Sequence, residues 1–173
     1  MTTPIPIRAA RREDCPAISA IYNHYVEHET CTYQTEPETL EERLAWFHRH
    51  GPEHPIFVAE AGGRLVGWAS LSPYNTRHGY RMTVEDSIYL DPGWRGRGLG
   101  KVLLATLVDA AVSRGHHTII AAISAEQASS VALHARAGFA PAGRLTQVGH
   151  KFGTWLDVIY MQRMLIDAAR MSP

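Results

Sequence analysis

A short turn built from glycine and arginine, residues 95–100, most constrains what this chain can fold into. It follows a run of β-forming residues at 82–90 and leads directly into the clearest amphipathic helix pattern, at 99–112. The first turn of a helix carries unpaired N–H groups and the positive end of the helix dipole. Glycines let that backbone approach an anion closely, and the arginines of the turn add positive charge together with Lys101. The segment therefore predicts a strand, a phosphate-binding turn and a helix.

Two familiar phosphate motifs fit this turn poorly. A nucleotide P-loop needs Ser or Thr directly after its Gly-Lys pair, where Val102 stands, and Gly at the position of Arg95. This excludes Walker chemistry. A dinucleotide fingerprint needs Gly in place of Lys101 and follows the first strand of a parallel unit, whereas this turn lies past mid-chain. The dinucleotide interpretation is therefore weak.

The rest of the pattern predicts one mixed α/β domain spanning residues 1–173. A length of 173 residues and a hydrophobic content of 45% are ordinary for one globular domain. Two β-runs joined by Gly62 and Gly63 predict an antiparallel hairpin, and the later strands should cross over. In chain order we expect strand 5–9, a helix capped by Asp14, a helix opened by Pro37 and Glu38, strands 56–60, 65–71 and 82–90, helix 99–112, strand 118–123, helix 129–136, and strands 142–148 and 154–164.

Charge and cysteine content argue against several protein classes. The chain has 17 Lys+Arg and 17 Asp+Glu, whereas a nucleic-acid-binding protein would need clustered positive charge. It shows no signal peptide, and no stretch approaches the roughly 20 apolar residues of a membrane span. Cys15 and Cys31 have neither metal-type nor redox-type spacing. We therefore expect a soluble, cytoplasmic protein whose partners include neither nucleic acid nor membrane.

Several segments resemble a known enzyme family. The turn at 95–100 resembles the Arg/Gln-x-x-Gly-x-Gly/Ala loop of the GNAT N-acetyltransferase superfamily. Longer segments are similar to its phosphinothricin and methionine sulfoximine acetyltransferases, and they cover nearly the whole chain in order. They are Ile-Tyr-Asn-His-Tyr at 21–25, Tyr-Gln-Thr-Glu-Pro at 33–37, Thr-Val-Glu-Asp-Ser-Ile-Tyr-Leu at 83–90, Leu-His-x-x-x-Gly-Phe at 133–139, and Val-Gly-His-Lys-Phe-Gly-Thr-Trp-Leu-Asp at 148–157.

The resemblance implies a fold, a reaction and partners. The fold would be a GNAT-type α/β (α+β) arrangement, with a mixed, mostly antiparallel central sheet of six to seven strands flanked by about four helices. The reaction would be direct transfer of the acetyl group of acetyl-CoA to the amino group of a small amino-acid-like substrate. Phosphinothricin, methionine sulfoximine and methionine sulfone are the expected types, and no metal is required. Family members are homodimers, so the loop from Gly149 to Gly153 would lie near the partner's site.

Amine acetylation needs a base, because most aliphatic amines are protonated at neutral pH. The resemblance assigns Glu85 as this general base, acting directly or through water. Alternation along the strand puts Thr83 and Ser87 on the same face as Glu85. The resemblance assigns His134 either as the proton donor to the coenzyme A thiolate or as a partner of Glu85.

The same resemblance assigns the coenzyme site. Backbone groups of Ile88, Tyr89 and Leu90 would pair with the pantetheine arm, and one of their N–H groups would bind the oxyanion. Gln127 stands where the family has Asn, so a contact through this amide is in question. The pyrophosphate would be held by Arg95, Gly96, Arg97, Gly98, Leu99, Gly100 and Lys101.

A carboxylate on the substrate requires a nearby arginine. Arg77 is the expected partner, with Arg81 as its competitor, because the loop at 73–80 resembles the family's substrate loop. Relatives that prefer methionine derivatives carry Trp-Arg where this chain has Tyr74 and Asn75, so the identity of the substrate stays open. The expected substrate-binding residues are Tyr33, Asn75, Thr76, Arg77, Tyr80, Glu85, Asp86 and Ser87.

Two alternatives compete with this interpretation. His24 and His28 fit an inverted zinc-peptidase pattern, His-x-x-Glu-His, but the sequence offers no identifiable third ligand. An acetyl-CoA sensor without turnover would keep the glycine turn and lack the acid–base pair. Glu85 and His134 are both present, which favours an enzyme.

Overall fold

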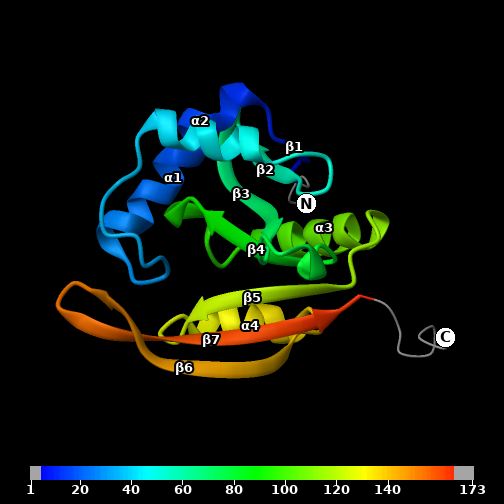
Figure 1. Ribbon diagram of the computed structural model, residues 1–173. Coiled ribbons are helices and arrows are strands. Elements are labelled where there is room, and N and C mark those ends of the chain that lie inside the picture. The colour runs from blue at the N-terminus through cyan, green and yellow to red at the C-terminus, as the bar shows by residue number, and fades with distance from the viewer. Residues whose placement is uncertain (1–4, 166–173) are drawn as a thin grey trace.

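The computed structural model describes residues 5–165, and within them the chain forms seven strands in one sheet and four α-helices. The strand order is β1-β2-β3-β4-β5-β7-β6, and the neighbouring strands are antiparallel except for the parallel pair β4 and β5. This confirms the predicted mixed, mostly antiparallel sheet (Figure 1). No helix in the described part is long and apolar enough to cross a membrane. The elements are β1 (Ile7–Ala9), α1 (Cys15–His28), α2 (Leu40–Arg49), β2 (Ile56–Ala61), β3 (Arg64–Pro73), β4 (Thr83–Leu90), α3 (Leu99–Ser113), β5 (Thr118–Ser124), α4 (Ala128–Arg136), β6 (Ala140–Lys151) and β7 (Thr154–Met164).

The sheet opens between its two parallel strands. β4 and β5 pair only over residues 83–85 and 118–120. Beyond that point β4 stays paired with β3 as far as Leu90, and β5 stays paired with β7 as far as Ser124. The two strands therefore diverge, as Figure 1 shows, and each turns one backbone edge toward the gap.

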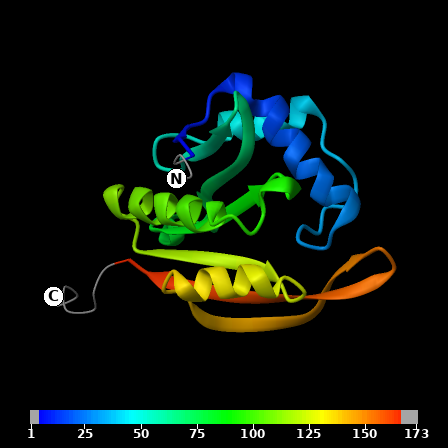
Figure 2. The same ribbon diagram turned by 180° about the vertical axis from the view of Figure 1, so that it is seen from behind.

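Helices cover both faces of the sheet. α1 and α2 lie on the face that carries Trp68 and Tyr89, whereas α3 and α4 lie on the face that carries Asp86 and Leu90 (Figures 1 and 2). Side chains alternate along a strand, so Glu85 shares the α1/α2 face with Tyr89. β4 therefore presents different chemistry to each side of the sheet.

The second helix begins later than the sequence predicts, and the first begins where predicted but without the expected side-chain cap. α2 starts at Leu40, after Pro37, because Thr39 forms a capping box with Glu42. The Thr39 amide donates to the Glu42 carboxylate at 2.7 Å, and the Glu42 amide donates back to the Thr39 hydroxyl at 3.2 Å. Asp14 precedes α1 as predicted, but its carboxylate pairs with Arg8 at 2.7 Å instead of capping the helix.

The hairpin of β6 and β7 is anchored to the end of α1 by a buried lysine. Lys151 is 3% exposed, and its Nζ donates to the carbonyls of Tyr25, Glu29 and Thr32 at 3.3, 2.7 and 2.9 Å. Carbonyls at a helix C-terminus lack helical partners and favour a cation. Lys151 therefore joins the last hairpin to the first helix within one chain.

Lys151→Met should lower the free energy of unfolding by roughly 2–3 kcal/mol, because buried carbonyls lose their donor. Urea unfolding of the variant and the wild type measures this difference. Lys101→Met removes an exposed lysine and should change the free energy by less than about 0.5 kcal/mol. Equal losses in both variants would contradict the anchoring role.

Candidate active site

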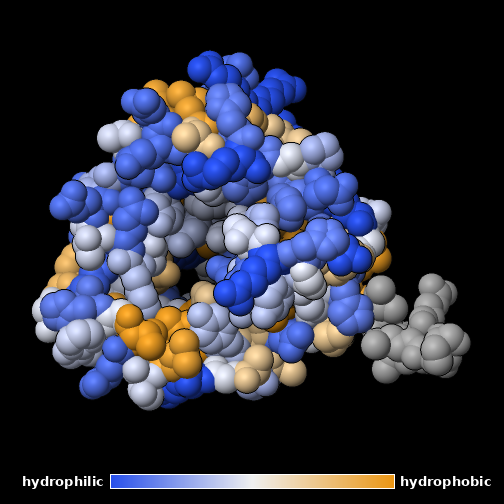
Figure 3. Space-filling model, viewed as in Figure 1, coloured by the Kyte–Doolittle hydropathy of each residue, from blue (hydrophilic) through white to orange (hydrophobic). Residues whose placement is uncertain are grey.

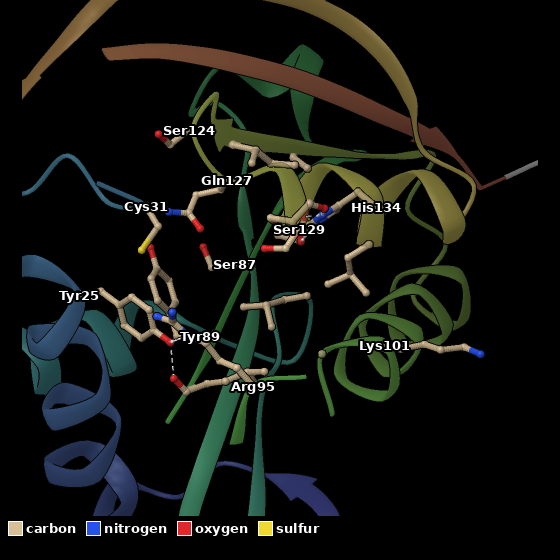
Figure 4. Close-up of a pocket in the computed structure, with 18 of the residues that line it drawn as sticks. Tyr25, Cys31, Ser87, Tyr89, Arg95, Lys101, Ser124, Gln127, Ser129 and His134 are labelled. Carbon is tan, nitrogen blue, oxygen red and sulfur yellow. Dashed lines mark hydrogen bonds and ion pairs between the residues drawn. The ribbon is translucent and has the colours of Figure 1, made fainter. Parts of the chain in front are cut away.

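A cleft of about 590 Å³ occupies the gap between β4 and β5. Its walls are the end of β4, the turn before α3, the start of α4, the end of β5 and the segment around the end of α1. Figure 3 shows a hollow near the middle of this face, and Figure 4 shows side chains from these elements converging on it. The predicted site residues that line the cleft are Asp86, Ser87, Ile88, Tyr89, Leu90, Arg95, Gly96, Gly98, Gly100, Lys101, Gln127 and His134.

The backbone of β4 offers hydrogen-bonding groups to this cleft. The Asp91 amide donates to a β3 carbonyl at 2.9 Å, and in an antiparallel ladder this pattern repeats at every second residue. The backbone of Tyr89 is therefore turned toward β3, whereas the backbone groups of Ile88 and Leu90 face the gap. The Leu90 carbonyl already accepts a hydrogen bond from the Tyr25 hydroxyl. The groups left for a ligand are the amides of Ile88 and Leu90 and the carbonyl of Ile88.

The glycine turn contains two backbone conformations that residues with a side chain rarely adopt. Gly96 and Gly98 have φ angles of 71° and 81°, in the left-handed region. An added Cβ would meet nothing within 4 Å at either position, so the backbone angle, and not crowding, requires glycine. Gly98 is the N-cap of α3, so the amides of Leu99 and Gly100 are unpaired donors of the first helical turn in the described part of the chain, whereas the Lys101 amide donates to the Gly98 carbonyl at 3.1 Å. This arrangement suits an anion.

The basic side chains beside the cleft have separate roles. Arg95 forms an ion pair with Glu29 and donates to the Tyr25 hydroxyl at 3.1 Å. It therefore ties the turn to α1. Lys101 lines the cleft without such a partner among the described residues, and Figure 4 shows its side chain extending away from the other labelled residues.

Two predicted residues of the turn lie outside the cleft wall. Arg97 stacks over Trp94, with its guanidinium carbon 4.8 Å from the ring centroid. Leu99 is 3% exposed and packs in the core beneath α3. Leu99 can therefore serve a ligand at the turn only through its backbone.

A buried histidine–aspartate pair closes the α4 side of the cleft. His134 is 4% exposed, with Nε2 2.9 Å from Asp86 Oδ2 and Nδ1 2.8 Å from the Ser130 carbonyl. A carbonyl can only accept, so Nδ1 carries a hydrogen. The remaining proton lies between Nε2 and Oδ2, which makes the pair an imidazolium with a carboxylate or a neutral ring with a carboxylic acid. Either way, the pair holds one exchangeable proton beside the cleft.

The surroundings of His134 favour its charged form. Burial lowers the pKa of His134, but the hydrogen bond from its ring to Asp86, the charge of that carboxylate and the Ser130 carbonyl outweigh burial and raise the pKa above 6.5. Asp86 Oδ1 and Ser124 Oγ are buried at the cleft and have no hydrogen-bond partner within residues 5–165. A ligand in the cleft can supply those partners.

Glu85 lies on the opposite face of the sheet from His134. It is partly buried, and this burial raises the pKa of Glu85, with a further rise from the charge of Asp86. Burial and then the charge of Glu85 also raise the pKa of Tyr160 on β7. The structure therefore gives His134 the partner Asp86 and leaves Glu85 on the α1/α2 side.

Most of the predicted substrate residues lie away from the cleft. Asn75, Thr76 and Arg77 are exposed in the loop before β4, where Asn75 Oδ1 accepts from the Arg77 amide at 3.0 Å. Tyr80 is 41% exposed, and its ring centroid lies 5.6 Å from that of Tyr74. The loop is thus a surface feature next to the start of β4.

Tyr33 packs against the last hairpin. Its hydroxyl donates to the Asp157 carbonyl at 2.6 Å. A Cβ on Gly149 would come within 2.4 Å of the Tyr33 ring, so the glycine allows this close contact. Tyr33 therefore helps to hold the hairpin in place.

Sequence reasoning missed Tyr25, Cys31 and Ser124 as parts of the cleft wall. Tyr25 lies in a segment that matches the family, but nothing in that segment indicates its bond to the β4 backbone. Cys31 has no neighbouring motif, and burial raises its pKa to about 12. Such residues are found only from the tertiary contacts.

Comparison with known proteins identifies the family. The acetyltransferase (GNAT) family model matches residues 18–139. The L-methionine sulfoximine/L-methionine sulfone acetyltransferase of Salmonella typhimurium is 40% identical over 164 residues, which cover 94% of this chain and 96% of that protein. The phosphinothricin N-acetyltransferase of Streptomyces coelicolor is 36% identical and covers 95% of this chain and 98% of its own. A crystal structure of a GNAT superfamily phosphinothricin acetyltransferase from Sinorhizobium meliloti, in complex with acetyl-CoA, has a TM-score of 0.93 and 37% identity, covering 98% of this chain and 92% of its own.

The fold and the relatives define the class of this protein as an acyltransferase. The chain belongs to the acetyltransferase (GNAT) family. This membership confirms the predicted enzyme class and sets aside the sensor and the zinc peptidase. His24 and His28 stack with ring centroids 4.7 Å apart, and residues 5–165 contain no group of three His, Cys, Asp or Glu placed to hold a metal.

Asp86→Asn should lower the pKa of His134, because it removes the carboxylate charge that raises it. An NMR titration of the His134 ring measures this directly, and Asp109→Asn, on the exposed side of α3, is the matched control. The folded pKa exceeds the unfolded one, so the stabilisation is fully present below about pH 6.5 and is lost as pH rises through the folded pKa. As the pH rises from about 6.5 through the folded pKa of His134, the free energy of unfolding should fall less in Asp86→Asn than in the wild type. An unchanged titration would contradict the assigned pair.

Proposed function

We propose that this chain is an N-acetyltransferase that moves the acetyl group of acetyl-CoA directly to the amino group of a small amino-acid-like substrate. The observation that carries the proposal is the gap between β4 and β5, whose open β4 edge leads into the glycine turn. A pantetheine arm can pair with such an edge as an added strand, and a diphosphate suits the helix start. The names of the relatives support the substrate class, and the acetyl-CoA in the Sinorhizobium meliloti structure supports the donor.

We assign the diphosphate to the amides from Gly96 to Gly100 and to the Lys101 ammonium group. The Ile88 backbone would pair with the pantetheine arm, and its amide would bind the oxyanion of the tetrahedral intermediate. Arg95 would support the turn through Glu29 instead of binding phosphate itself. Gln127 lines the cleft at the start of α4, so its amide remains a candidate for the coenzyme despite its extra methylene.

Glu85 is assigned as the general base. Its raised pKa brings it closer to neutral pH, which suits a group that must accept a proton from an amine. The amine nitrogen attacks the thioester carbon, a C–N bond forms, and the C–S bond breaks. The amine proton passes to Glu85, directly or through water, and the departing thiolate takes the proton held between His134 and Asp86.

Direct transfer is supported by the protonation state of the Cys31 thiol, which lines the cleft. A covalent acetyl-enzyme would need a thiolate, but burial raises the pKa of Cys31 to about 12, so this thiol is protonated at neutral pH. Cys15 is fully buried in the core. Neither cysteine therefore offers a ready nucleophile.

A homodimer formed through the last hairpin is part of the proposal. Leu145, Val148 and Phe152 are 47%, 53% and 59% exposed on this hairpin, and Figure 3 shows hydrophobic surface over this part of the molecule. Lys151 is committed to carbonyls of its own chain. In the loop from Gly149 to Gly153, the apolar side chain free to reach a partner's site is therefore Phe152.

Glu85→Gln should lower kcat by about 10²–10⁴-fold, since the amide cannot accept the amine proton. Thiol release from acetyl-CoA with L-methionine sulfone, L-methionine sulfoximine or L-phosphinothricin measures the rate, and calorimetry measures acetyl-CoA affinity. The affinity should stay the same, and the exposed control Glu53→Gln should keep full activity. Equal turnover in Glu85→Gln and the wild type would remove Glu85 as the base. No thiol release by the wild type with any amine would overturn the proposed reaction.

A further inference from the structure

The end of α1 makes contacts that join two parts of the coenzyme cleft, the β4 edge and the glycine turn. Tyr25 lies in the last turn of this helix, is 5% exposed and lines the cleft. Its hydroxyl donates to the Leu90 carbonyl at the end of β4 and accepts a hydrogen bond from Arg95 Nε at 3.1 Å. Burial raises the pKa of Tyr25, so its hydroxyl keeps its hydrogen at neutral pH and can donate. One hydroxyl therefore connects the β4 edge with the glycine turn.

The guanidinium group of Arg95 is fixed by the same helix end. It forms an ion pair with Glu29, and its carbon lies 4.9 Å from the centroid of the Tyr25 ring. Figure 4 shows Tyr25 and Arg95 together on the opposite side of the cleft from His134. Arg95 directly precedes Gly96, the first glycine of the turn. Holding the Arg95 side chain therefore restricts where the turn can lie.

Glu29 occupies a position that otherwise disfavours a carboxylate. It is the C-cap of α1, and a helix C-terminus carries the negative end of the dipole. Glu29 does not line the cleft, but through its ion pair its negative charge lies next to a turn that suits an anion. Among the described residues, the partner of its carboxylate is Arg95. The favourable interaction of this carboxylate is therefore the one that holds Arg95.

The helix end that carries these side chains is itself anchored. Lys151 Nζ donates to the carbonyls of Tyr25 and Glu29 at 3.3 and 2.7 Å. An ammonium group at this place also offsets the negative end of the helix dipole. Tyr25 and Glu29 therefore project from a backbone that is fixed to the last hairpin, which gives the glycine turn a rigid support.

We propose that Glu29 and Tyr25 are positioning residues for the coenzyme: Glu29 fixes the glycine turn through Arg95, and Tyr25 aligns that turn with the β4 edge. The proposal deepens the proposed function and rests on it, because it needs the diphosphate at the turn. A turn that is already ordered loses less conformational entropy on binding, which raises the affinity. In the competing account Arg95 binds the diphosphate directly, and Glu29 only competes for the guanidinium group and repels the ligand.

Glu29→Gln gives the two accounts opposite signs. The amide removes a negative charge near an anionic ligand, so repulsion alone predicts a lower Kd for acetyl-CoA. Positioning predicts that the Kd rises about tenfold, with kcat at saturating acetyl-CoA unchanged, because the turn loses its support. Calorimetry measures the Kd without turnover, and thiol release measures kcat. An unchanged or lower Kd would overturn the proposal, whereas a wild type that does not bind acetyl-CoA would overturn the proposed function.

Two further variants show whether Glu29 acts through Arg95. Glu27→Gln is the matched control, because Glu27 is exposed on the same helix and loses the same charge, and it should bind acetyl-CoA as the wild type does. Arg95→Gln should raise the Kd by a factor similar to that of Glu29→Gln. The double variant should bind no more weakly than Arg95→Gln alone, since both changes break one contact. Additive losses, or an equal loss in Glu27→Gln, would contradict the assigned role of Glu29.

A shorter acetyl donor separates the roles of the two residues. S-acetylpantetheine carries the thioester without the diphosphate, so Glu29→Gln should keep the wild-type kcat/KM with it. Tyr25→Phe keeps the ring but releases the Leu90 carbonyl, so kcat/KM should fall about tenfold with S-acetylpantetheine and with acetyl-CoA. The ratio of the two donors in one preparation does not depend on the folded fraction.

Two results with these donors would overturn the proposal. An equal loss with both donors in Glu29→Gln would show general damage to the site instead of a displaced turn. A loss confined to acetyl-CoA in Tyr25→Phe would remove the assigned link between Tyr25 and the β4 edge.

Discussion

The separation of β4 from β5 is the constraint on which the rest of this structure depends. Each strand is fully paired on its other side, β4 with β3 and β5 with β7, so neither can close the gap without losing an existing ladder. The Tyr25 hydroxyl holds the Leu90 carbonyl and keeps the end of β4 directed toward α1. Buried backbone groups without partners cost free energy, so a ligand that supplies hydrogen bonds along this edge completes the sheet.

The same gap connects the two faces of the sheet, and this explains how distant groups can serve one reaction. Glu85 lies on the α1/α2 face, whereas His134 and Asp86 lie on the α3/α4 face. In the proposed reaction the amine approaches from the first side and the coenzyme thiol leaves on the second. The base and the proton donor then need no contact with each other. Their pKa values rise for different reasons: burial for Glu85, and the Asp86 carboxylate opposing burial for His134.

The sequence predicted what local patterns control. The glycine turn, the hairpin at Gly62 and Gly63 and the helix after the turn depend on backbone angles and apolar spacing within a few residues, and all three are found. Alternation also put Glu85 and Ser87 on one face. The start of α2 was misplaced because Thr39 is a better cap than the residues around Pro37.

Longer-range relations could not be predicted in this way. The partnership of His134 with Asp86 joins residues 48 positions apart, and the anchoring of the last hairpin by Lys151 spans more than 100. The buried Arg43 likewise stacks against the rings of Tyr22, Trp46 and Trp68, which come from two helices and a strand. No spacing rule in a single sequence encodes such contacts, because they depend on how elements pack.

A crystal structure of this chain with acetyl-CoA tests the central claim most directly. The account predicts diphosphate oxygens within hydrogen-bond distance of the amides from Gly96 to Gly100, and a thioester carbonyl facing the Ile88 amide between β4 and β5. Coenzyme bound with its diphosphate away from the glycine turn, or with its pantetheine arm outside the gap, would contradict it.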